Sequence, residues 1–344
     1  MGKENVLHKL IIKMAKKQQE NEAEMSAIEK LYAKYNKTEN IFKAPSSLED
    51  IDLSVSRLNS PLLSFDRYLG GAPALGKITT YSAFASCGKT SLALAIAGAN
   101  PDKIIGFVDA EYNWDDPSYL WIDKYFGIDK ERIHVLQPTY LEEGAEMVED
   151  LCNVCDIVIY DGFDSIAPKG EYQATMEEQQ MGLQARAYKK FFRRSMGKIY
   201  KSKAALIVTN HLYENIGNVF EPFKEPGGKA IHDYASQKLY LTRSNSKDKN
   251  GNIIGQDVNV TINKDKLSGN RGKKFSLPYD NKLGFDIEMD ILNNAVDLGV
   301  VGQKGAFFSF DGTNIGQGKE NARNTLKDNP DLVLEIVKLC REKF

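Results

Sequence analysis

Short apolar segments and amphipathic segments alternate along the middle of the chain. The apolar segments predict strands at 77–83, 104–111, 132–138, 156–162 and 205–210. Segments with apolar positions three and four residues apart predict helices at 88–99, 117–127, 140–153 and 181–203. The strand at 156–162 is almost entirely apolar, which is typical of a sheet buried on both faces. This alternation predicts an α/β fold, with a central, mostly parallel sheet and helices on both sides.

The two ends of the chain have different patterns. Residues 1–35 carry apolar positions at helical spacing in a charged segment, and 36–47 form a polar linker with a proline. The helix expected at 1–35 packs either on its own core or on a neighbouring subunit, and the pattern leaves both open. From about residue 235, strands follow one another without helices, which predicts an antiparallel extension. Together with a small α+β unit at the C-terminus, this gives three expected parts, at 1–47, 48–284 and 285–344.

Composition excludes some classes of protein. Hydrophobic residues make up 42% of the 344 residues, which is typical of a globular protein. A net charge of −2 excludes a uniformly basic surface for nucleic acid, although not a local basic stripe. No apolar run of about 18 residues and no secretory signal is found, so we expect a cytoplasmic protein without a membrane span. Cys152 and Cys155 form one CxxC pair, which we interpret as small residues at a helix end and not as a zinc site.

The segment AFASCGKT at 83–90 carries the signature of a phosphate-binding loop. It ends in Gly-Lys-Thr and lies between a predicted strand and an apolar helix, the context in which backbone N–H groups hold phosphates. Lys89 is expected to reach the outer phosphates of ATP, and the Thr90 hydroxyl to ligate Mg²⁺. The position that requires glycine is Gly88, whereas a methyl group at Ala83 is tolerated if φ is negative there. The candidate nucleotide-binding residues of the loop are Ala83, Ser86, Cys87, Gly88, Lys89, Thr90 and Ser91.

Cys87 is the unusual residue of this loop. Because it lies beside a helix N-terminus and a phosphate site, we expect a lowered pKa for its thiol. The hypothesis that follows is that thiol reagents inactivate the ATPase and that ATP protects it.

Polar side chains at the ends of other predicted strands supply the remaining parts of an ATPase site. Asp161 ends an apolar strand, as a carboxylate that holds the Mg²⁺ shell does, or it simply caps that strand. Glu111 is a candidate to activate the attacking water, with Asp109 as its rival. His211 either senses the γ-phosphate or caps its strand. Such residues gather at one edge of an open α/β sheet.

The helix at 186–203 contains eight basic residues and no acid. It is either a solvated helix face or a track for a phosphate backbone, and its density of charge favours the track. Arg186, Lys190, Arg193 and Arg194 share a face. Two long polar segments flank it, at 170–182 and 213–230, and exposed apolar side chains on such loops can insert between bases. The basic segment 263–274 has the pattern of a surface hairpin.

Five segments in order along the chain resemble the RecA recombinase family, in its bacterial and phage branch. The most specific is KGAFFSFDGTNIGQGKENARNTLKDNP; the matching segments are 107–120, 164–171, 181–186, 226–236 and 304–330. The resemblance implies a RecA-type P-loop ATPase core, an N-terminal helix that packs on the adjacent subunit, and a small C-terminal domain. It also implies helical filaments on single-stranded DNA, with ATP between subunits, that pair with and exchange strands of double-stranded DNA. Single-strand-binding and loader proteins are expected partners, in a bacterial or phage-infected cell.

The resemblance also implies residue roles. Lys89 and Thr90 bind phosphate and Mg²⁺, Glu111 is the catalytic base, and Asp161 is the Walker B acid, acting on the metal through water. His211 occupies the place of a γ-phosphate-sensing glutamine, where phage relatives resembling UvsX also have histidine. The adenine contacts are Asp116, after a one-residue insertion, and Tyr119, with Tyr279 near the adenine of the neighbour. Lys264 and Lys266 reach the neighbour's γ-phosphate. The DNA-facing residues are Met181, Arg186, Arg193, Ile216, Gly227 and Gly228.

The sequence departs from the family pattern in four places. Ala83 replaces the first loop glycine, Gly162 replaces a serine, and Asp233 replaces a phenylalanine that relays the ATP state between subunits. The sequence ends at Phe344 without an acidic tail, from which we expect weaker autoinhibition of duplex binding. Three other functions are weighed against a recombinase: a mediator that binds ATP and DNA without strand exchange, a ring helicase on the same core, and, more remotely, a metabolite kinase.

Overall fold

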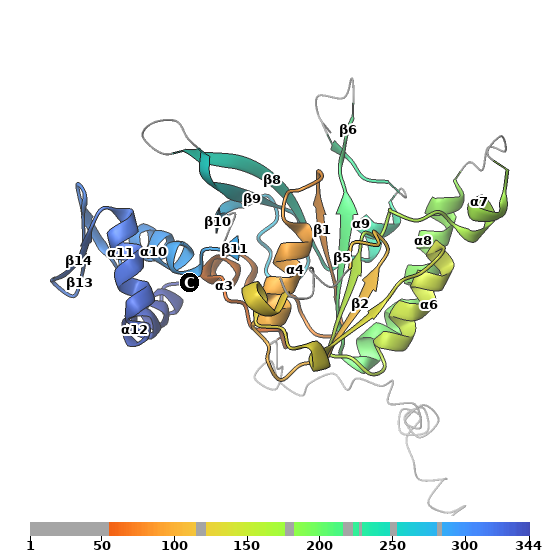
Figure 1. Cartoon of the computed structure of the whole chain (residues 1–344), viewed down its shortest axis with the longest axis horizontal. Helices are drawn as coiled ribbons and strands as arrows, with labels where there is room; N and C mark the ends of the chain where they lie inside the picture. The colour runs from red at the N-terminus through yellow and green to blue at the C-terminus, as the bar shows by residue number, and fades with distance from the viewer. Residues whose placement is uncertain are drawn as a thin grey trace, which may run out of the picture. The chain divides into compact units, whose positions relative to one another are not determined.

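The computed structural model describes residues 55–114, 122–175, 182–215, 223–226, 229–247, 253–280 and 284–344 (Figure 1). The helix predicted at 1–35 therefore lies outside the described residues, and its packing stays a prediction. Within the described residues, no helix combines the length and apolarity needed to cross a membrane.

One large sheet forms the centre of the fold. In spatial order its strands are β11 (Gly284–Phe285), β10 (Lys274–Asp280), β9 (Ile253–Asp265), β8 (Gln237–Lys247), β1 (Ile78–Ala83), β5 (Ala205–His211), β4 (Ile157–Asp161), β2 (Ile105–Asp109) and β3 (Ile133–Leu136). The strands from β8 to β3 are parallel, and β9 to β11 continue the sheet in antiparallel pairing. The predicted parallel core and its antiparallel extension are both confirmed.

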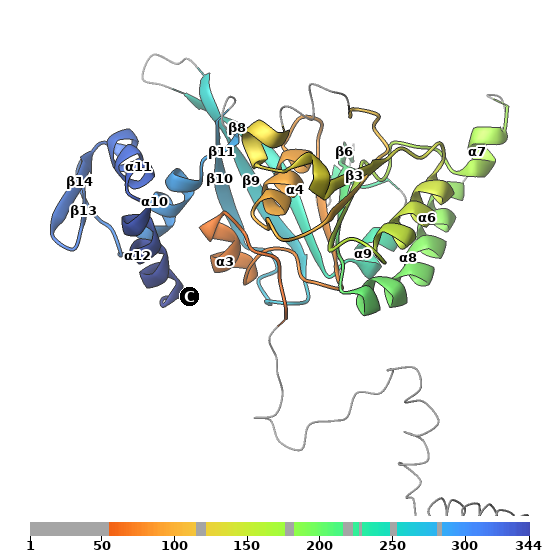
Figure 2. The ribbon, with the colours of Figure 1, turned by 60° about the horizontal axis from the view of Figure 1, so that its bottom comes forward.

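Helices cover both faces of the sheet (Figures 1 and 2). One face packs on α3 (Leu63–Leu69) and α4 (Lys89–Gly98), and the other on α6 (Leu141–Leu151), α8 (Leu183–Ser202) and α9 (Ala230–Tyr234). The side chains of β4 alternate between the two cores: Ile159 contributes to the first, and Val158 and Tyr160 to the second. This division explains why the strand is apolar at every position.

Short elements connect these layers. They are the 3-10 helix η3 (Lys130–Arg132), α7 (Lys169–Gln173), and the hairpin strands β6 (Tyr213–Glu214) and β7 (Phe223–Lys224). The helix predicted at 117–127 is present over the described residues 122–126. Because β4 and β5 both end at the carboxyl edge of the sheet, the two polar segments expected to bind DNA leave from that edge. Figure 1 shows α7 and β6 projecting on this side.

The C-terminal part has its own core. It consists of α10 (Ile287–Asp297), a small sheet of β12 (Gly302–Lys304), β13 (Phe307–Phe310) and β14 (Thr313–Gln317), then α11 (Lys319–Asp328) and α12 (Pro330–Arg341). Leu292, Phe308, Leu326 and Ile336 are buried in this core. The Asp286 side chain caps α10 by accepting a hydrogen bond from Met289 N at 3.0 Å. The expected fold class is confirmed, while the exact domain boundaries stay a prediction.

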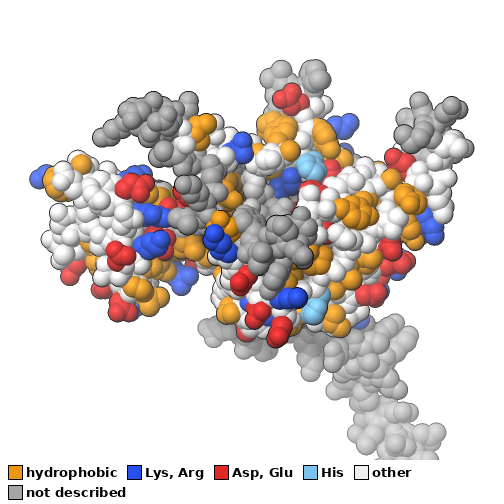
Figure 3. Space-filling view, viewed as in Figure 1, with side chains coloured by type: hydrophobic (Ala, Val, Ile, Leu, Met, Phe, Trp, Pro, Cys, Tyr) orange, Lys and Arg blue, Asp and Glu red, His pale blue; other side chains and the backbone are white. Residues whose placement is uncertain are grey.

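On the face shown in Figure 3, acidic and basic side chains are interspersed over the core and the C-terminal part. This distribution agrees with the nearly neutral net charge of −2.

Candidate active site

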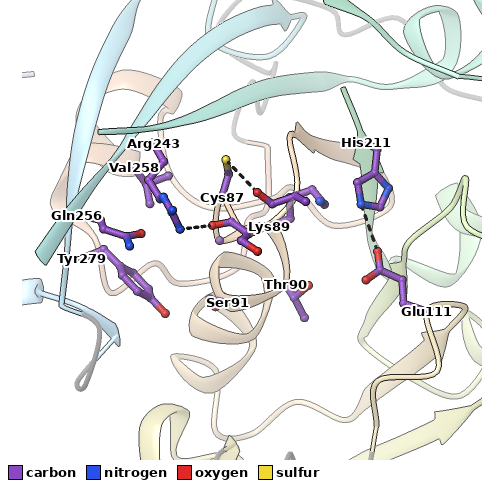
Figure 4. A pocket seen from close by; sticks show the side chains of 13 residues that line it. Cys87, Lys89, Thr90, Ser91, Glu111, His211, Arg243, Gln256, Val258 and Tyr279 are labelled. Carbon is purple, nitrogen blue, oxygen red and sulfur yellow. Dashed lines mark hydrogen bonds and ion pairs between the residues drawn. The ribbon is translucent and has the colours of Figure 1, made fainter. Parts of the chain in front are cut away.

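A pocket lies where β1 leads into the phosphate loop (Figure 4). Its walls come from the loop and the start of α4, from the ends of β2 and β5, and from β8, β9 and β10. The lining residues are Ala85, Ser86, Cys87, Gly88, Lys89, Thr90, Ser91, Glu111, His211, Arg243, Gln256, Val258 and Tyr279. The structure therefore brings together the predicted loop residues 86–91 with three more distant candidates.

The loop backbone is left-handed at two positions. Gly88 has a φ of 83°, so that any side chain there is strained whatever space surrounds it. Ser86 has a φ of 57°, and its carbonyl accepts a hydrogen bond from Arg243 Nη1 at 3.0 Å. Ala83 lies in β1, outside the left-handed region, with its side chain fully buried in the core. The requirement for glycine thus falls on Gly88, and Ala83 does not line the pocket.

The expectation of a lowered pKa for Cys87 is wrong. Its side chain is 7% exposed, and its Sγ lies 3.6 Å from the carbonyl oxygen of Ala85. Burial raises the pKa of the thiol, and the charges of Arg243 and Lys89 offset this only in part. Because a thiol with a raised pKa is mostly protonated at neutral pH, rapid reaction with thiol reagents is not expected.

Asp161 lies behind Thr90. Its Oδ2 accepts a hydrogen bond from Thr90 Oγ1 at 2.8 Å, and its Oδ1 accepts one from Thr209 Oγ1 at 2.5 Å. The pKa of Asp161 is raised to about 6, chiefly by burial; the charge of Glu111 acts in the same direction, and the two hydroxyl bonds act in the opposite direction. A hydroxyl and a carboxylate in contact are oxygen ligands of the kind that Mg²⁺ takes, so these residues fit the expected metal.

The structure separates Glu111 from its rival Asp109. Asp109 is 1% exposed, and its carboxylate accepts hydrogen bonds from the backbone N–H groups of Asn113 and Trp114 and from Gln137 Nε2. It therefore holds the turn that follows β2. Glu111 lies two residues beyond the strand and lines the pocket.

The glycine at position 162 accommodates the carboxylate of Glu111. A Cβ atom at Gly162 would collide with Glu111 Oε1 and would lie 2.7 Å from Ser165 Oγ. In this arrangement, a serine at 162 requires the Glu111 side chain to move. The departure from the family pattern at Gly162 therefore bears directly on the candidate base.

His211 lies between two carboxylates. Its Nε2 is 3.7 Å from Glu111 Oε1, and its Nδ1 is 3.1 Å from Asp164 Oδ1. The hydrogen bond with Asp164 raises the pKa of His211, burial and the charge of Lys89 lower it, and the charge of Glu111 raises it. Asp164 is absent from the site predicted by sequence, although its place three residues after Asp161 could have pointed to it.

The antiparallel extension supplies the other wall of the pocket. Arg243 on β8, with Gln256 and Val258 on β9, lines the pocket without having been predicted. No local motif marks these residues, because pairing between strands brings them to the loop. Tyr279 on β10 also lines this pocket, so it lies beside the phosphate loop of its own chain, and its expected place near the adenine of a neighbour stays a prediction.

Lys264 and Lys266 lie away from this pocket. Strand β8 pairs in parallel with β1, with Ala83 opposite Leu241, and Lys264 is paired with Lys238 three residues earlier on β8. The amino group of Lys264 contacts the carbonyl oxygens of His232 and Asp233. Burial, together with the charges of Lys266 and Lys238, lowers the pKa of Lys264 to about 8. Neither lysine lines the pocket of its own chain.

Two of the basic side chains of α8 form ion pairs with a neighbouring helix. Arg194 and Lys198 pair with Glu149 of α6, whose side chain is 4% exposed, and Ser195 Oγ donates to the same carboxylate at 2.8 Å. Arg194, which the sequence places on the same helix face as Arg186 and Arg193, therefore joins two helices. Arg186 and Arg193 are exposed, and Arg194 and Lys198 are half-exposed, with 49% of each side chain accessible.

A buried ion pair connects the second polar segment to the sheet. Glu225, which follows β7, pairs with Lys238 on β8 and accepts a hydrogen bond from Ser82 Oγ at 2.5 Å. Lys238 is 1% exposed, and Ser82 is the residue of β1 before Ala83. This pair fixes one end of the segment at the strand that carries the phosphate loop.

Six predicted site residues lie outside the described residues. They are Asp116, Tyr119, Met181, Ile216, Gly227 and Gly228.

Comparisons with known proteins show the family to which this chain belongs. A family model described as the RecA N-terminal domain matches residues 19–283, and one described as the RecA C-terminal domain matches 289–344. Protein RecA of Clostridium botulinum (strain Alaska E43 / Type E3) is 33% identical over 302 residues, or 86% of this chain and 83% of that protein. Protein RecA of Aquifex aeolicus (strain VF5) is 30% identical over 335 residues, or 96% and 94%. With both domains matched in order, the chain belongs to the RecA family of recombinases and DNA-dependent ATPases.

Proposed function

We propose that this chain hydrolyses ATP as a helical filament on single-stranded DNA and uses that filament for homologous pairing and strand exchange with double-stranded DNA. The observation that carries the proposal is the convergence of Lys89, Thr90, Glu111 and His211 on one pocket, with Asp161 behind Thr90. These residues come from four segments that end at one edge of the sheet, which is where open α/β folds bind ligands.

Within one subunit, each residue has a distinct role. Lys89 neutralises charge on the outer phosphates, and the backbone N–H groups of the loop bind the phosphate oxygens. The Thr90 hydroxyl and the Asp161 carboxylate would hold Mg²⁺, Asp161 through water. When bound, the metal supplies charge stabilisation to the phosphoryl group being transferred. Glu111 orients the attacking water and accepts its proton.

The γ-phosphate acts as a switch between subunits. In the proposed filament, His211 binds it within one subunit, and Lys264 and Lys266 reach it from the next. Hydrolysis removes this connection and loosens the hold on DNA, as in other nucleotide switches. The position of both lysines outside their own pocket supports a role across an interface.

We propose that DNA binds at the edge of the central sheet where the carboxyl ends of the parallel strands lie. Arg186 and Arg193 are exposed on α8, and the segments 170–182 and 213–230 leave the same edge of the sheet as the phosphate loop. Met181, Ile216, Gly227 and Gly228 complete the proposed surface, and Asp116 and Tyr119 the adenine contacts. The proposed setting is the cytoplasm of a bacterial cell, with single-strand-binding and loader proteins as further partners.

The decisive experiment measures ATP turnover with and without single-stranded DNA and images the product by negative-stain electron microscopy. DNA-stimulated turnover and helical filaments are expected. Turnover without stimulation would favour a mediator, and closed hexamers a ring helicase. Lys89→Ala is expected to lower turnover at least about 100-fold and to abolish ATP-dependent filaments, because it removes a phosphate ligand. Normal strand exchange by this variant would contradict the site assignment.

A further inference from the structure

We propose that Asp164 is a positioning residue for the ATPase reaction: it orients the His211 ring and holds a proton on Nδ1, so that Nε2 faces Glu111 and the pocket. This inference rests on the proposed role of His211 as the sensor of the γ-phosphate. It goes beyond that role because it assigns a function to a carboxylate outside the pocket lining.

The contacts of Asp164 leave the imidazole little freedom. Asp164 Oδ1 accepts a hydrogen bond from the backbone N–H of His211 at 3.1 Å and lies 3.1 Å from the ring Nδ1, while Oδ2 lies 3.2 Å from the same nitrogen. The Asp164 side chain is 2% exposed. One buried carboxylate therefore binds both the backbone and the ring of the same residue, which fixes the direction of the side chain.

The carboxylate also decides which nitrogen carries the proton. An ionised carboxylate only accepts hydrogen bonds, so Nδ1 must be the donor. The other nitrogen, Nε2, then has a proton only when the ring is positively charged. Nε2 lies 3.7 Å from Glu111 Oε1 and faces the pocket (Figure 4). Because phosphate oxygens accept hydrogen bonds, a charged ring is the form that binds a γ-phosphate through Nε2.

The charges around the ring favour this form. Asp164, on the segment after β4, and Glu111, on the segment after β2, raise the pKa of His211, whereas burial and Lys89 on α4 lower it, and the net direction is upward. From β6, the Tyr213 hydroxyl donates a hydrogen bond to Asp164 Oδ2 at 3.4 Å. Asp164 thus touches the sensor and the first residue of the segment 213–230 at once.

A carboxylate at position 164 is useful to a histidine at position 211 but not to a glutamine there. A glutamine amide donates hydrogen bonds at any pH and needs no carboxylate to do so. A histidine in that position needs a partner that sets both its proton and its orientation. The prediction is that Asp164 matters far more while residue 211 is a histidine.

The test is a double-mutant cycle of Asp164→Asn and His211→Gln, with DNA-stimulated turnover measured from about pH 5.5 to 9. Asp164→Asn is expected to lower the maximal rate roughly 10-fold and to move the alkaline fall in activity to lower pH, with little change in KM. In the His211→Gln background, Asp164→Asn should have a much smaller effect, because only the contacts of Asp164 with the backbone N–H of residue 211 and with the Tyr213 hydroxyl remain. Equal effects in both backgrounds, or an unchanged pH profile, would overturn the inference. Asp102→Asn, at an exposed surface position, is the matched control.

The protonation of the His211 ring can also be measured directly in the wild-type chain, so the test does not depend on whether a variant folds. The wild-type chain has four histidines, so ¹⁵N-labelled histidine can resolve each ring by NMR, with His211→Gln assigning one of them. Neutral His211 is expected to carry its proton on Nδ1, and a proton on Nε2 instead would refute the inference. His211→Ala separates the two hypotheses: full turnover by that variant contradicts the sensor role, whereas loss of turnover with a silent Asp164→Asn contradicts only the positioning role.

Discussion

Two buried carboxyl groups of this chain have nearly the same electrostatic environment. Asp161 lies behind the nucleotide pocket, and Asp290 lies where α3 meets α10. Burial raises the pKa of each to about 6, and each accepts hydrogen bonds from a hydroxyl group. Asp161 contacts Thr90, which lines an open pocket. Asp290 contacts Ser64 and Asn294, and all of these groups are buried.

The difference shows that a shifted pKa does not identify a functional site by itself. A buried charge also arises wherever two helices meet through polar groups, as a structural joint. What distinguishes the two carboxylates is whether their partners face a space that a ligand can enter. The cations of this chain can be compared in the same way, and matched pairs of variants test the distinction.

The largest contrast is expected between Asp161→Asn and Asp290→Ala. Asp161→Asn should lower DNA-stimulated turnover at least about 100-fold with a small change in stability, because it removes a charged oxygen from the proposed metal shell. Asp290→Ala should leave the turnover of folded protein intact but lower the free energy of unfolding by about 3 kcal/mol, because Ser64 loses its acceptors. Chemical denaturation and steady-state turnover, measured on both variants, check the pair.

The pH dependence of stability sharpens this contrast. A carboxyl group whose pKa is raised to about 6 in the folded state binds its proton more tightly there than in the unfolded chain. Its stabilising contribution is present below about pH 4 and is lost as the pH rises through about 6. Asp290→Ala should remove this component of the stability profile. An unchanged profile would show that Asp290 is ionised in the folded protein at lower pH than we infer.

A second pair compares Lys238, at the start of β8, with Lys264 and Lys266, at the end of β9 and just after it. The double variant Lys264→Ala with Lys266→Ala should keep the stability and nucleotide affinity of the isolated subunit, yet lower turnover in the filament roughly 100-fold, because it removes cations proposed to act on the neighbour's phosphate. Lys238→Met should do the reverse and lower stability by about 3 kcal/mol, since it leaves Glu225 buried without its partner. Unchanged turnover by the double variant would rule out the role across the interface.

Sequence predicted the parts of this molecule that local patterns encode. The phosphate loop, Asp161, Glu111 and the alternation of strands and helices all depend on neighbouring residues or on the ends of apolar strands. The choice between Glu111 and Asp109 needed the structure, because it depends on Gln137 reaching back to Asp109 from 28 residues away. The extension strands deliver Arg243 and Gln256 to the pocket by pairing, which no motif records.

The sequence did not reveal the environment of Cys87 or of Arg194, and the physical reason is the same for both. The sequence places Cys87 beside a helix N-terminus and shows nothing of its burial, which reverses the direction of its pKa shift. The sequence likewise places Arg194 on a basic helix and shows nothing of Glu149, 45 residues earlier, which pairs with it. Burial and distant partners are tertiary properties, so residue type and local spacing predict candidates for a role more reliably than the role itself.

The smallest contrast is expected between the two kinds of arginine on α8. Arg186→Ala should weaken binding of single-stranded DNA several-fold and reduce the slope of log affinity against log salt by about 1, because one phosphate contact disappears. Arg194→Ala should leave that slope unchanged and lower the free energy of unfolding by about 1 kcal/mol or less, because its pair with Glu149 is half-exposed on the arginine side and Lys198 still binds the same carboxylate. Binding isotherms at several salt concentrations, with thermal unfolding of both variants, measure the pair. If both arginines change the salt slope equally, α8 binds DNA through the face that packs on α6, and the division between exposed and packed cations fails there.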